Sequence, residues 1–316
     1  MWLWILAAVL LVLVAALFGA ARYLFQVSVA RAEKEGTGEE YENDSNSIWN
    51  PFAQRMKAAQ QWIRDHTAET MTITSHDGLR LAALYLPAEV EKPRGVVLAF
   101  HGYRSLATVD FALEAEFFHT LGYRVVLPYQ RSHGLSQGKY ITYGVKERFD
   151  CRDWADYLAK RFPGEDIFLM GISMGSATVM MASELKLPGC VRGIVADCGF
   201  TSPAAIMAHV ARKDYKFPAF PLLNAVDLIA RVRAGFSLHG ADSRKALANT
   251  KLPVLFLHGE ADDFVPVSMT EENFAACRGE KEKYLVPGAA HAQSFAVDTA
   301  GCEEKIQAFL ESHSMK

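Results

Sequence analysis

Beyond about residue 70, short apolar runs alternate with helical segments, and this alternation constrains the fold more than any other feature. The run at 95–100 is continuously apolar, which is typical of a strand buried on both faces. The segments 71–74 and 79–86 predict a hairpin. Further predicted strands are 124–127, 167–170, 191–196, 253–257 and 283–286, and predicted helices are 108–121, 145–162, 174–186, 268–277 and 294–312. Repeated units of this kind predict an α/β protein with a mainly parallel sheet and helices on both faces.

The composition limits the class of protein. Of the 316 residues, 33 are Lys or Arg and 36 are Asp or Glu, which gives a formal net charge of −3. Charged residues make up 22% and hydrophobic residues 50%, which excludes a disordered chain, a collagen-like repeat and a multi-span membrane protein. Because no basic excess is available to neutralise phosphates, we do not expect nucleic acid as a partner.

The N-terminal segment predicts a single transmembrane helix. Residues 2–21 carry no charge, and as a helix they would span about 30 Å, the thickness of a bilayer hydrocarbon core. Trp2 and Trp4 at one end and Tyr23 at the other match the aromatic belts of the two interfaces.

A cleaved signal peptide is the alternative interpretation, because Gly19 and Ala21, or Ser28 and Ala30, offer small residues for a cleavage site. We favour an uncleaved anchor, since the apolar run exceeds the usual length of about 7–15 residues and no Lys or Arg precedes it.

Positive charges indicate the side of the membrane. Arg22, Arg31 and Lys34 all follow the apolar run, so the positive-inside rule predicts that the large domain that follows is cytoplasmic. The five cysteines are odd in number and include no CxxC pair, and reduced thiols fit the same compartment.

A linker and a short helix follow the anchor. Residues 31–47, with six acidic and two basic side chains, predict a solvated tether. Asn50 and Pro51 predict the start of a helix. Its narrow apolar stripe is expected to dock on the domain rather than lie on the membrane, and consists of Ile48, Phe52, Met56, Ala59 and Ile63.

The chain therefore divides into three parts. These are a transmembrane anchor (1–22), a linker with an amphipathic helix (23–69) and an α/β domain (70–316), in which 201–250 forms a small helical cap. We expect that removal of residues 1–46 releases the domain from membranes without loss of its fold.

The segment 171–175 reads Gly-Ile-Ser-Met-Gly, a G-x-S-x-G pattern at the junction of a predicted strand and a predicted helix. In such a turn Ser173 adopts a strained conformation and projects its hydroxyl from the carboxyl edge of the sheet. The alternative is a tight turn with a buried serine.

A nucleophilic serine needs a base, and the base needs a carboxylate that orients it. His291 follows the last predicted strand and Asp262 the strand before it, so both fall in loops at the carboxyl ends of strands. The chain order is Ser173, Asp262, His291. Asp263, which is adjacent, and Asp197, which ends an earlier strand, are alternative acids.

From about residue 70 to its end, the chain resembles the serine hydrolases of the α/β-hydrolase fold, in particular bacterial membrane-anchored, esterase-like members with a short cap. The resemblance lies in His101-Gly102 after an early strand, Arg131-Ser132-His133-Gly134-Leu135-Ser136, the 171–175 turn, Gly259-x-x-Asp262-x-x-Val265-Pro266 and the terminal His291.

The resemblance implies a role for each candidate residue. Ser173 is expected to be the nucleophile, His291 the general base and then acid, and Asp262 the orienting carboxylate. The oxyanion hole is expected to consist of the backbone N–H groups of Tyr103 and Met174.

The remaining histidines receive structural interpretations. His101 is expected to shape the oxyanion loop, His133 to hydrogen-bond within its loop, and His258 to start a turn. No His, Asp or Glu cluster has the spacing of metal ligands, so we expect no metal, and the resemblance implies no cofactor.

The predicted cap suggests the substrate. Its apolar residues would either form a pocket for an acyl chain or pack the cap onto the core: Phe200, Ile206, Met207, Phe217, Phe220, Leu222, Leu223 and Phe236. With the anchor, they favour a small-molecule or lipid-like acyl substrate, and the expected reaction is hydrolysis of a carboxylic ester. Thioesterase, amidase or peptidase activity on the same residues is the alternative. A non-catalytic binding protein that kept the fold is the alternative of another class.

Overall fold

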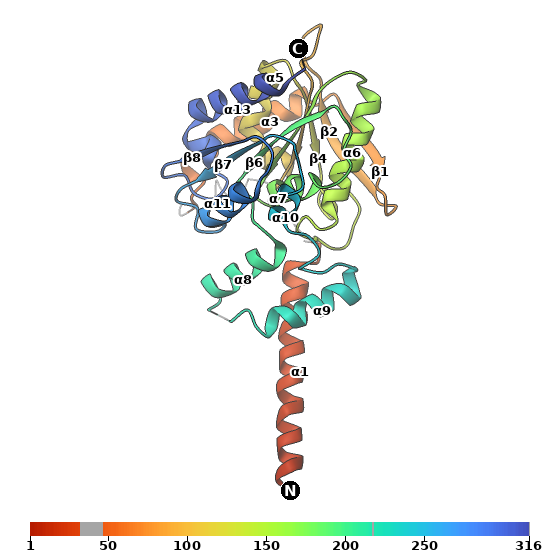
Figure 1. The fold of residues 1–316 in the computed structure, drawn as a ribbon, viewed down its shortest axis with the longest axis vertical. Coiled ribbons are helices and arrows are strands. Elements are labelled where there is room, and N and C mark those ends of the chain that lie inside the picture. The colour runs from red at the N-terminus through yellow and green to blue at the C-terminus, as the bar shows by residue number, and fades with distance from the viewer. Residues whose placement is uncertain (32–46, 217, 316) are drawn as a thin grey trace.

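The computed structural model describes residues 1–31, 47–216 and 218–315. Its core is an eight-stranded sheet with the strand order β1-β2-β4-β3-β5-β6-β7-β8 (Figure 1). The strands are β1 (Glu69–Thr74), β2 (Arg80–Leu86), β3 (Val96–Phe100), β4 (Arg124–Pro128), β5 (Ile167–Ile172), β6 (Val191–Asp197), β7 (Val254–Gly259) and β8 (Lys281–Val286). β2 pairs antiparallel with β1 and with β4, whereas the other neighbours pair parallel. The predicted hairpin and the mainly parallel sheet are confirmed.

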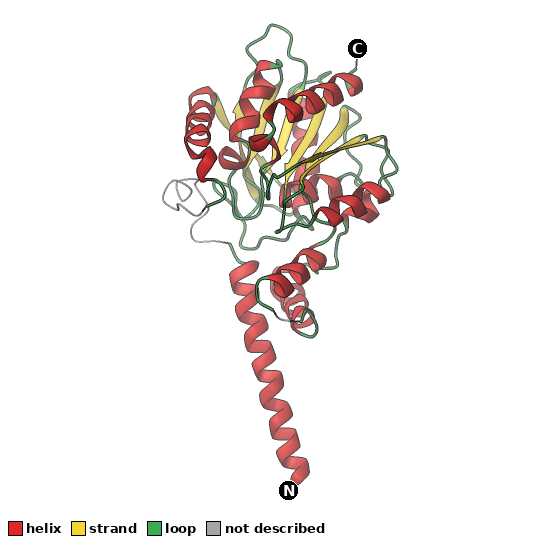
Figure 2. Cartoon of the chain, turned by 90° about the vertical axis from the view of Figure 1, so that its left-hand side faces the viewer, coloured by secondary structure: helices red, strands yellow, loops and turns green. Residues whose placement is uncertain are grey.

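Helices cover both faces of the sheet (Figures 1 and 2). Strand β3 shows why: Val97 and Ala99 pack into one hydrophobic cluster, and Val96 and Leu98 pack into another on the opposite face. The first cluster is covered by α3 (Ala53–His66), α4 (Ala107–Asp110), α5 (Ala112–Thr120), α12 (Ser294–Val297) and α13 (Thr299–His313). The second is covered by α6 (Glu147–Arg161), α7 (Met174–Ala182), α10 (Ser243–Leu247) and α11 (Val267–Ala276).

The region 201–250 contains three helices, of which two form the cap. These two, α8 (Pro203–Lys213) and α9 (Leu222–Ala234), lie beyond the sheet, on the side from which the N-terminal helix extends (Figure 1). In contrast, α10 packs against α7 on the face of the sheet. The cap is thus smaller than the sequence predicts. Phe217, one of its predicted apolar residues, lies outside the described residues.

The N-terminal helix α1 (Trp2–Ser28) is long and apolar enough to cross a membrane. It extends six residues beyond the predicted end of the anchor at residue 22. Its side chains are exposed as far as residue 16, but Ala21 and Phe25 are buried against α9 in a hydrophobic cluster of the cap. The segment after residue 22 is therefore part of the folded domain, in contrast to the predicted linker. The rest of the predicted tether, 32–46, lies outside the described residues.

Residues 29–31 continue from α1 as a short extended segment bound to the core. Ala30 forms an antiparallel bridge with Tyr140, and the N–H of Ile141 donates to the carbonyl oxygen of Val29 at 2.7 Å. The guanidinium of Arg31 donates to two backbone carbonyl oxygens of the 130–136 loop at 2.6 and 2.8 Å. The end of α1 is thereby fixed to the domain.

The predicted amphipathic helix docks on the domain. A 3₁₀ turn, η1 (Asn50–Phe52), leads into α3, which packs against α5 and buries Met56, Ala59 and Ile63. Ile48 precedes the helix and is exposed, so it does not belong to the buried stripe.

Candidate active site

The turn between β5 and α7 holds Ser173 in a strained backbone conformation. Its φ of 55° and ψ of −113° lie in a region that costs a residue with a side chain about 1–3 kcal/mol. The N–H of Ser173 donates to the carbonyl oxygen of Asp197, at the end of β6, at 2.9 Å. The turn is therefore held by the neighbouring strand, and the serine stands at the carboxyl edge of the sheet.

Two glycines allow this turn to form. A Cβ atom on Gly175 would lie 1.7 Å from the carbonyl oxygen of Phe100. A Cβ atom on Gly171 would lie 2.3 Å from the carbonyl carbon of Gly175. Because any side chain at either position would overlap the backbone, α7 crosses the ends of β3 and β5 at a distance that only glycine permits.

The structure brings Ser173, His291 and Asp262 together from three separate loops. Nε2 of His291 lies 2.9 Å from Oγ of Ser173, and Nδ1 of His291 lies 2.7 Å from Oδ2 of Asp262. The three residues follow β5, β8 and β7, so all of them meet at the carboxyl edge. Because the carboxylate accepts a hydrogen bond from the N–H at Nδ1, the neutral ring presents the lone pair of Nε2 to the serine hydroxyl.

Four donors fix the carboxylate of Asp262. Its Oδ1 accepts the N–H groups of Phe264 and Val265, both at 2.9 Å, and its Oδ2 contacts both His291 and His258. Burial alone would raise the pKa of Asp262, but the hydrogen bonds with His258 and His291 outweigh burial and hold the pKa below its usual range. Asp262 is therefore ionised at neutral pH.

His258 supports this carboxylate, a role that the sequence did not predict. The side chain of His258 is fully buried, and its Nε2 lies 3.1 Å from Oδ2 of Asp262 and 2.9 Å from the carbonyl oxygen of Val265. Its Nδ1 lies 2.7 Å from Oγ1 of Thr270. The signal in the sequence is its position in an apolar strand, four residues before Asp262.

Neither alternative acid contacts His291 in the described part of the chain. The side chain of Asp263 is 83% exposed and forms an ion pair with Lys213 at 2.8 Å. Asp197 is buried and accepts a hydrogen bond from Oγ of Ser294 at 3.0 Å. Burial raises the pKa of Asp197.

The loop after β3 meets the serine from the other side. A Cβ atom on Gly102 would lie 3.4 Å from Cβ of Ser173, so the two backbones are adjacent. Oδ2 of Asp110 accepts the N–H of Gly102 at 2.5 Å, and Oδ1 accepts the hydroxyl of Ser105 at 2.5 Å. Burial raises the pKa of Asp110. Asp110 thus fixes the loop. The sequence did not predict this role, because no motif marks an acid eight residues after a glycine.

The N–H groups of Tyr103 and Met174 lie directly after Gly102 and Ser173 in sequence. Neither group donates to an acceptor among the described residues. Met174 is the first residue of α7, where an N–H has no partner within the helix. Both groups therefore remain available to donate to an oxygen atom beside the serine.

His101 and His133 hold the loops that surround these groups. Nε2 of His101 accepts the N–H of Gln130 at 3.1 Å, and Nε2 of His133 accepts the N–H of Arg104 at 3.1 Å. Burial lowers the pKa of both imidazoles, that of His133 to about 4. Both rings are therefore neutral at pH 7, in keeping with the loop-shaping roles expected for them.

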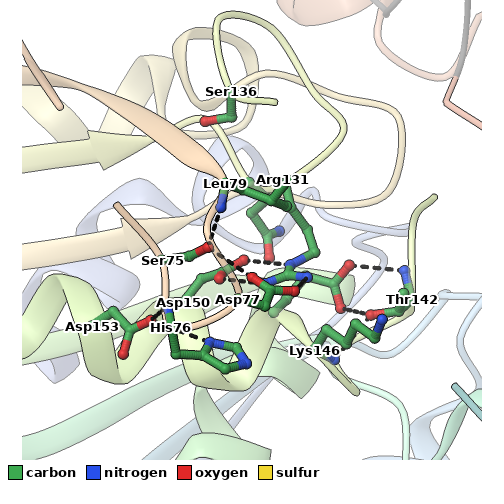
Figure 3. A network of polar contacts seen from close by, with 12 residues as sticks. Ser75, His76, Asp77, Leu79, Arg131, Ser136, Thr142, Lys146, Asp150 and Asp153 are labelled. Carbon is green, nitrogen blue, oxygen red and sulfur yellow. Dashed lines mark hydrogen bonds and ion pairs between the residues drawn. The ribbon is translucent and has the colours of Figure 1, made fainter. Parts of the chain in front are cut away.

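Arg131 ties the same loop to the hairpin and to α6 (Figure 3). Its guanidinium donates to both oxygens of Asp150, at 2.6 Å each, and to both oxygens of Asp77, at 2.8 and 3.1 Å. The hydroxyl of Ser75 donates to Asp77 as well, at 2.7 Å. Burial alone would lower the pKa of Arg131, but the contacts with Asp150 and Asp77 outweigh burial and raise it. The guanidinium of Arg131 therefore stays protonated, and its ion pairs anchor the 130–136 loop.

The end of α1 reaches this site. The hydroxyls of Tyr103 and Tyr143 both donate to the carbonyl oxygen of Ser28, at 2.9 and 2.8 Å. Their rings stack with centroids 5.2 Å apart. Tyr103 is one of the two candidate oxyanion residues, so the N-terminal helix directly contacts the loop beside Ser173.

Two side-chain groups among the described residues have the spacing of metal ligands, but their chemistry does not suit a metal. In the first, His291 and Asp262 already bind each other, and burial raises the pKa of Cys198, which disfavours the thiolate that a metal needs. In the second, His76 pairs with Asp153, and Asp150 is held by Arg131 in the network of Figure 3.

Comparison with known proteins agrees with this architecture. Residues 91–219 match the family described as "Serine aminopeptidase, S33". The protein YqkD of Bacillus subtilis is 29% identical over 196 residues, which cover 62% of this chain and 64% of YqkD, slightly less than two thirds of that relative. The protein YfhR of Salmonella typhi is 26% identical over 237 residues, which cover 72% of this chain and 76% of YfhR.

Solved structures share the fold. The esterase Pf2001 of Pyrococcus furiosus superimposes with a TM-score of 0.61 at 22% sequence identity. The superposition covers 78% of this chain and 91% of the Pf2001 chain. Est1E of Butyrivibrio proteoclasticus, solved with ferulic acid bound, superimposes with a TM-score of 0.60 at 19% identity and covers 77% of this chain and 98% of its own. Together with the sheet order and the position of the strained serine, these likenesses show that the chain has the α/β-hydrolase fold.

Proposed function

We propose that the chain is a serine hydrolase that cleaves carboxylic esters through an acyl-enzyme. The observation that carries the proposal is the hydrogen-bonded series Ser173–His291–Asp262, with distances of 2.9 and 2.7 Å. Two further observations support it: the strained turn that presents the serine, and the two N–H groups without acceptors beside it. Pf2001, which shares the fold, is named as an esterase.

The geometry supports acylation as follows. Oγ of Ser173 attacks the carbonyl carbon of the ester while its proton passes to Nε2 of His291, and Asp262 stabilises the imidazolium that forms. The negative oxygen of the tetrahedral intermediate accepts the N–H groups of Tyr103 and Met174, each of which contributes about 2.7–4 kcal/mol. The bond to the leaving oxygen then breaks, and His291 donates its proton to the departing alcohol.

Deacylation repeats these steps with water. His291 takes a proton from a water molecule that attacks the acyl carbon, the bond to Oγ breaks, and the serine recovers its proton as the acid leaves. Water is the only co-reactant that the reaction consumes.

The test is labelling of the full-length protein, in mild detergent, with a fluorophosphonate probe that reacts only with activated serines. We expect labelling of the wild type, none in Ser173→Ala, and a loss of at least a hundredfold in His291→Ala. Ser312→Ala, on an exposed turn of α13, is the matched control and should label normally. A folded wild type that does not label, or Ser173→Ala that still does, contradicts the proposal and favours a binding protein.

The reaction class needs a second comparison, because a thioester or an amide can enter the same mechanism. Matched esters, thioesters and aminoacyl arylamides with the same acyl group should give kcat/KM in the order ester, thioester, amide. An amide cleaved faster than its ester would instead support the aminopeptidase activity that the description of the matching family names.

A further inference from the structure

The length of the exposed part of α1, which precedes its contacts with the cap, determines how close the cap lies to a bilayer that α1 spans. The side chains of residues 2–16 are exposed, and Leu17 is the first to be partly buried by the cluster that contains α9. Fifteen residues rise about 22 Å, whereas the hydrocarbon core is about 30 Å thick. If α1 spans the bilayer, the apolar layer therefore reaches past Leu17, to the level at which α9 contacts the helix.

The cap presents apolar side chains at that level. One face of α9 packs on the hydrophobic cluster through Leu223, Val226 and Ala230. On the opposite face Leu228 and Val232 are 49% and 78% exposed. The turn before the helix adds Phe220, which is 75% exposed. In water these side chains would remain hydrated, whereas at the level set by α1 they meet lipid.

Arginines border these apolar residues. Arg231 and Arg233 lie in the last turn of α9, on either side of Val232. Arg231 is paired with Asp227 at 2.8 Å, whereas Arg233 is exposed, as is Arg22 on α1 just after the uncharged run. Long arginine side chains can keep their stems in the apolar layer while the guanidinium groups reach lipid phosphates. This arrangement of exposed apolar and basic residues fits the headgroup layer.

The candidate active site lies on the same side of the domain. The hydroxyls of Tyr103 and Tyr143 bind the end of α1, and Tyr103 lies in the loop that contacts Ser173. The carboxyl edge of the sheet therefore faces the side from which α1 extends, where the cap lies (Figures 1 and 2).

We propose that α9 and the turn before it lie in the headgroup layer of the bilayer, with Phe220, Leu228 and Val232 immersed and Arg233 at the lipid phosphates. The substrate is then an acyl ester dissolved in the membrane, which reaches Ser173 past the cap. The substrate part of this inference rests on the proposed function, whereas the position of α9 does not.

Depth-dependent quenching tests the position of α9. In a background with Trp2→Phe and Trp4→Phe, full-length Val232→Trp is inserted into phosphatidylcholine–phosphatidylglycerol vesicles, with or without lipids brominated near the headgroup end of the acyl chains. Trp49, Trp62 and Trp154 remain in this background, so the signal of interest is the fluorescence that Val232→Trp adds to it. We expect bromination to quench this added fluorescence by at least a third. Val90→Trp, at an exposed position in the loop before β3, is the matched control and should not change.

Equal quenching of the two added tryptophans by the brominated lipids, in protein that floats with the vesicles, overturns the proposal. The proposal is also overturned if the detergent-solubilised wild type sediments as a dimer and Val232→Glu as a monomer. In that case a second copy of the chain would cover the exposed face of α9.

Activity tests the substrate class. We expect Val232→Glu to retain its kcat/KM for a short water-soluble ester and to lose at least tenfold for a long-chain ester embedded in vesicles, whereas Val90→Glu keeps both. Equal rates of Val232→Glu and wild type on the embedded ester overturn the membrane-substrate inference. If bromination quenches Val232→Trp but the wild type hydrolyses no ester, the proposed function fails and the position of α9 stands.

Discussion

Asp262 uses both of its oxygens as acceptors, and this determines how acid affects the protein. Two backbone N–H groups and two histidines surround the carboxylate, which is buried. Their hydrogen bonds hold the pKa of Asp262 below the value of about 3.9 expected in the unfolded chain. The ionised carboxylate therefore stabilises the fold above about pH 4, and this contribution is lost as the pH falls through the folded-state pKa.

We therefore predict a pH-dependent cost for Asp262→Asn. At pH 7 the substitution should lower the free energy of unfolding by about 1.5–3 kcal/mol, the worth of hydrogen bonds to a charged group. Below about pH 4 the wild type should lose stability towards that of the variant. Urea unfolding of the two proteins between pH 7 and pH 3 measures the difference. Asp263→Asn, at the adjacent exposed residue, should cost little at any pH, and a difference that does not change with pH would contradict the argument.

At the scale of single residues, the sequence predicted the three candidate catalytic residues but not the residues that position them. Ser173, Asp262 and His291 could be placed because each follows a strand, and parallel strands bring their carboxyl ends to one edge. His258 and Asp110 were missed because their roles depend on which loops fold against them.

At the scale of elements, α1 combines an exposed apolar part and a part that packs into the domain. Its exposed half ends at residue 16, and beyond it Ala21 and Phe25, one helical turn apart, pack into the cap. The sequence did not show this boundary, because in a segment without polar residues a packing stripe has the same composition as a lipid-facing surface. Strands such as 95–100 were predicted well, since a continuous apolar run flanked by polar residues has few other interpretations.

Two deletions separate these parts. Removal of residues 2–31 exposes the apolar side chains of Ile141 and Val226 and removes the carbonyl oxygen of Ser28, so we expect at least a tenfold loss of kcat/KM for a water-soluble ester and a lower Tm. Removal of residues 2–16 keeps every buried part of α1, so both quantities should stay within error of the wild type. Equal behaviour of the two deletions would instead favour the independent domain that the sequence suggested.

At the scale of the whole molecule, the distribution of charge and the position of the C-terminus are relevant to the question of which side of the membrane the domain occupies. Arg22 and the two arginines at the end of α9 all lie on the domain side of the exposed part of α1. The C-terminus lies at the opposite end of the domain from α1, so a fused protein there would not disturb the cap (Figure 1).

We propose that the catalytic domain is cytoplasmic, in accord with the positive-inside rule. A C-terminal fusion to green fluorescent protein, expressed in a bacterium, should be fluorescent, and a fusion to alkaline phosphatase at the same position should be inactive. The opposite pair of results, with both fusions intact on a gel, would place the domain outside the cytoplasm.

The hydrogen bond between Ser28 and Tyr143 also imposes an order on synthesis. Tyr143 follows Ser28 by 115 residues, so a ribosome that adds about 5–20 residues per second needs roughly 6–23 s to deliver it. During this interval the helix exists without its partners. Once inserted in a bilayer, α1 would hold Phe25 at the membrane surface, and the cap would pack against Phe25 afterwards. If α1 spans a bilayer, the loop beside Ser173 therefore receives its contact with Ser28 only after the helix has been inserted.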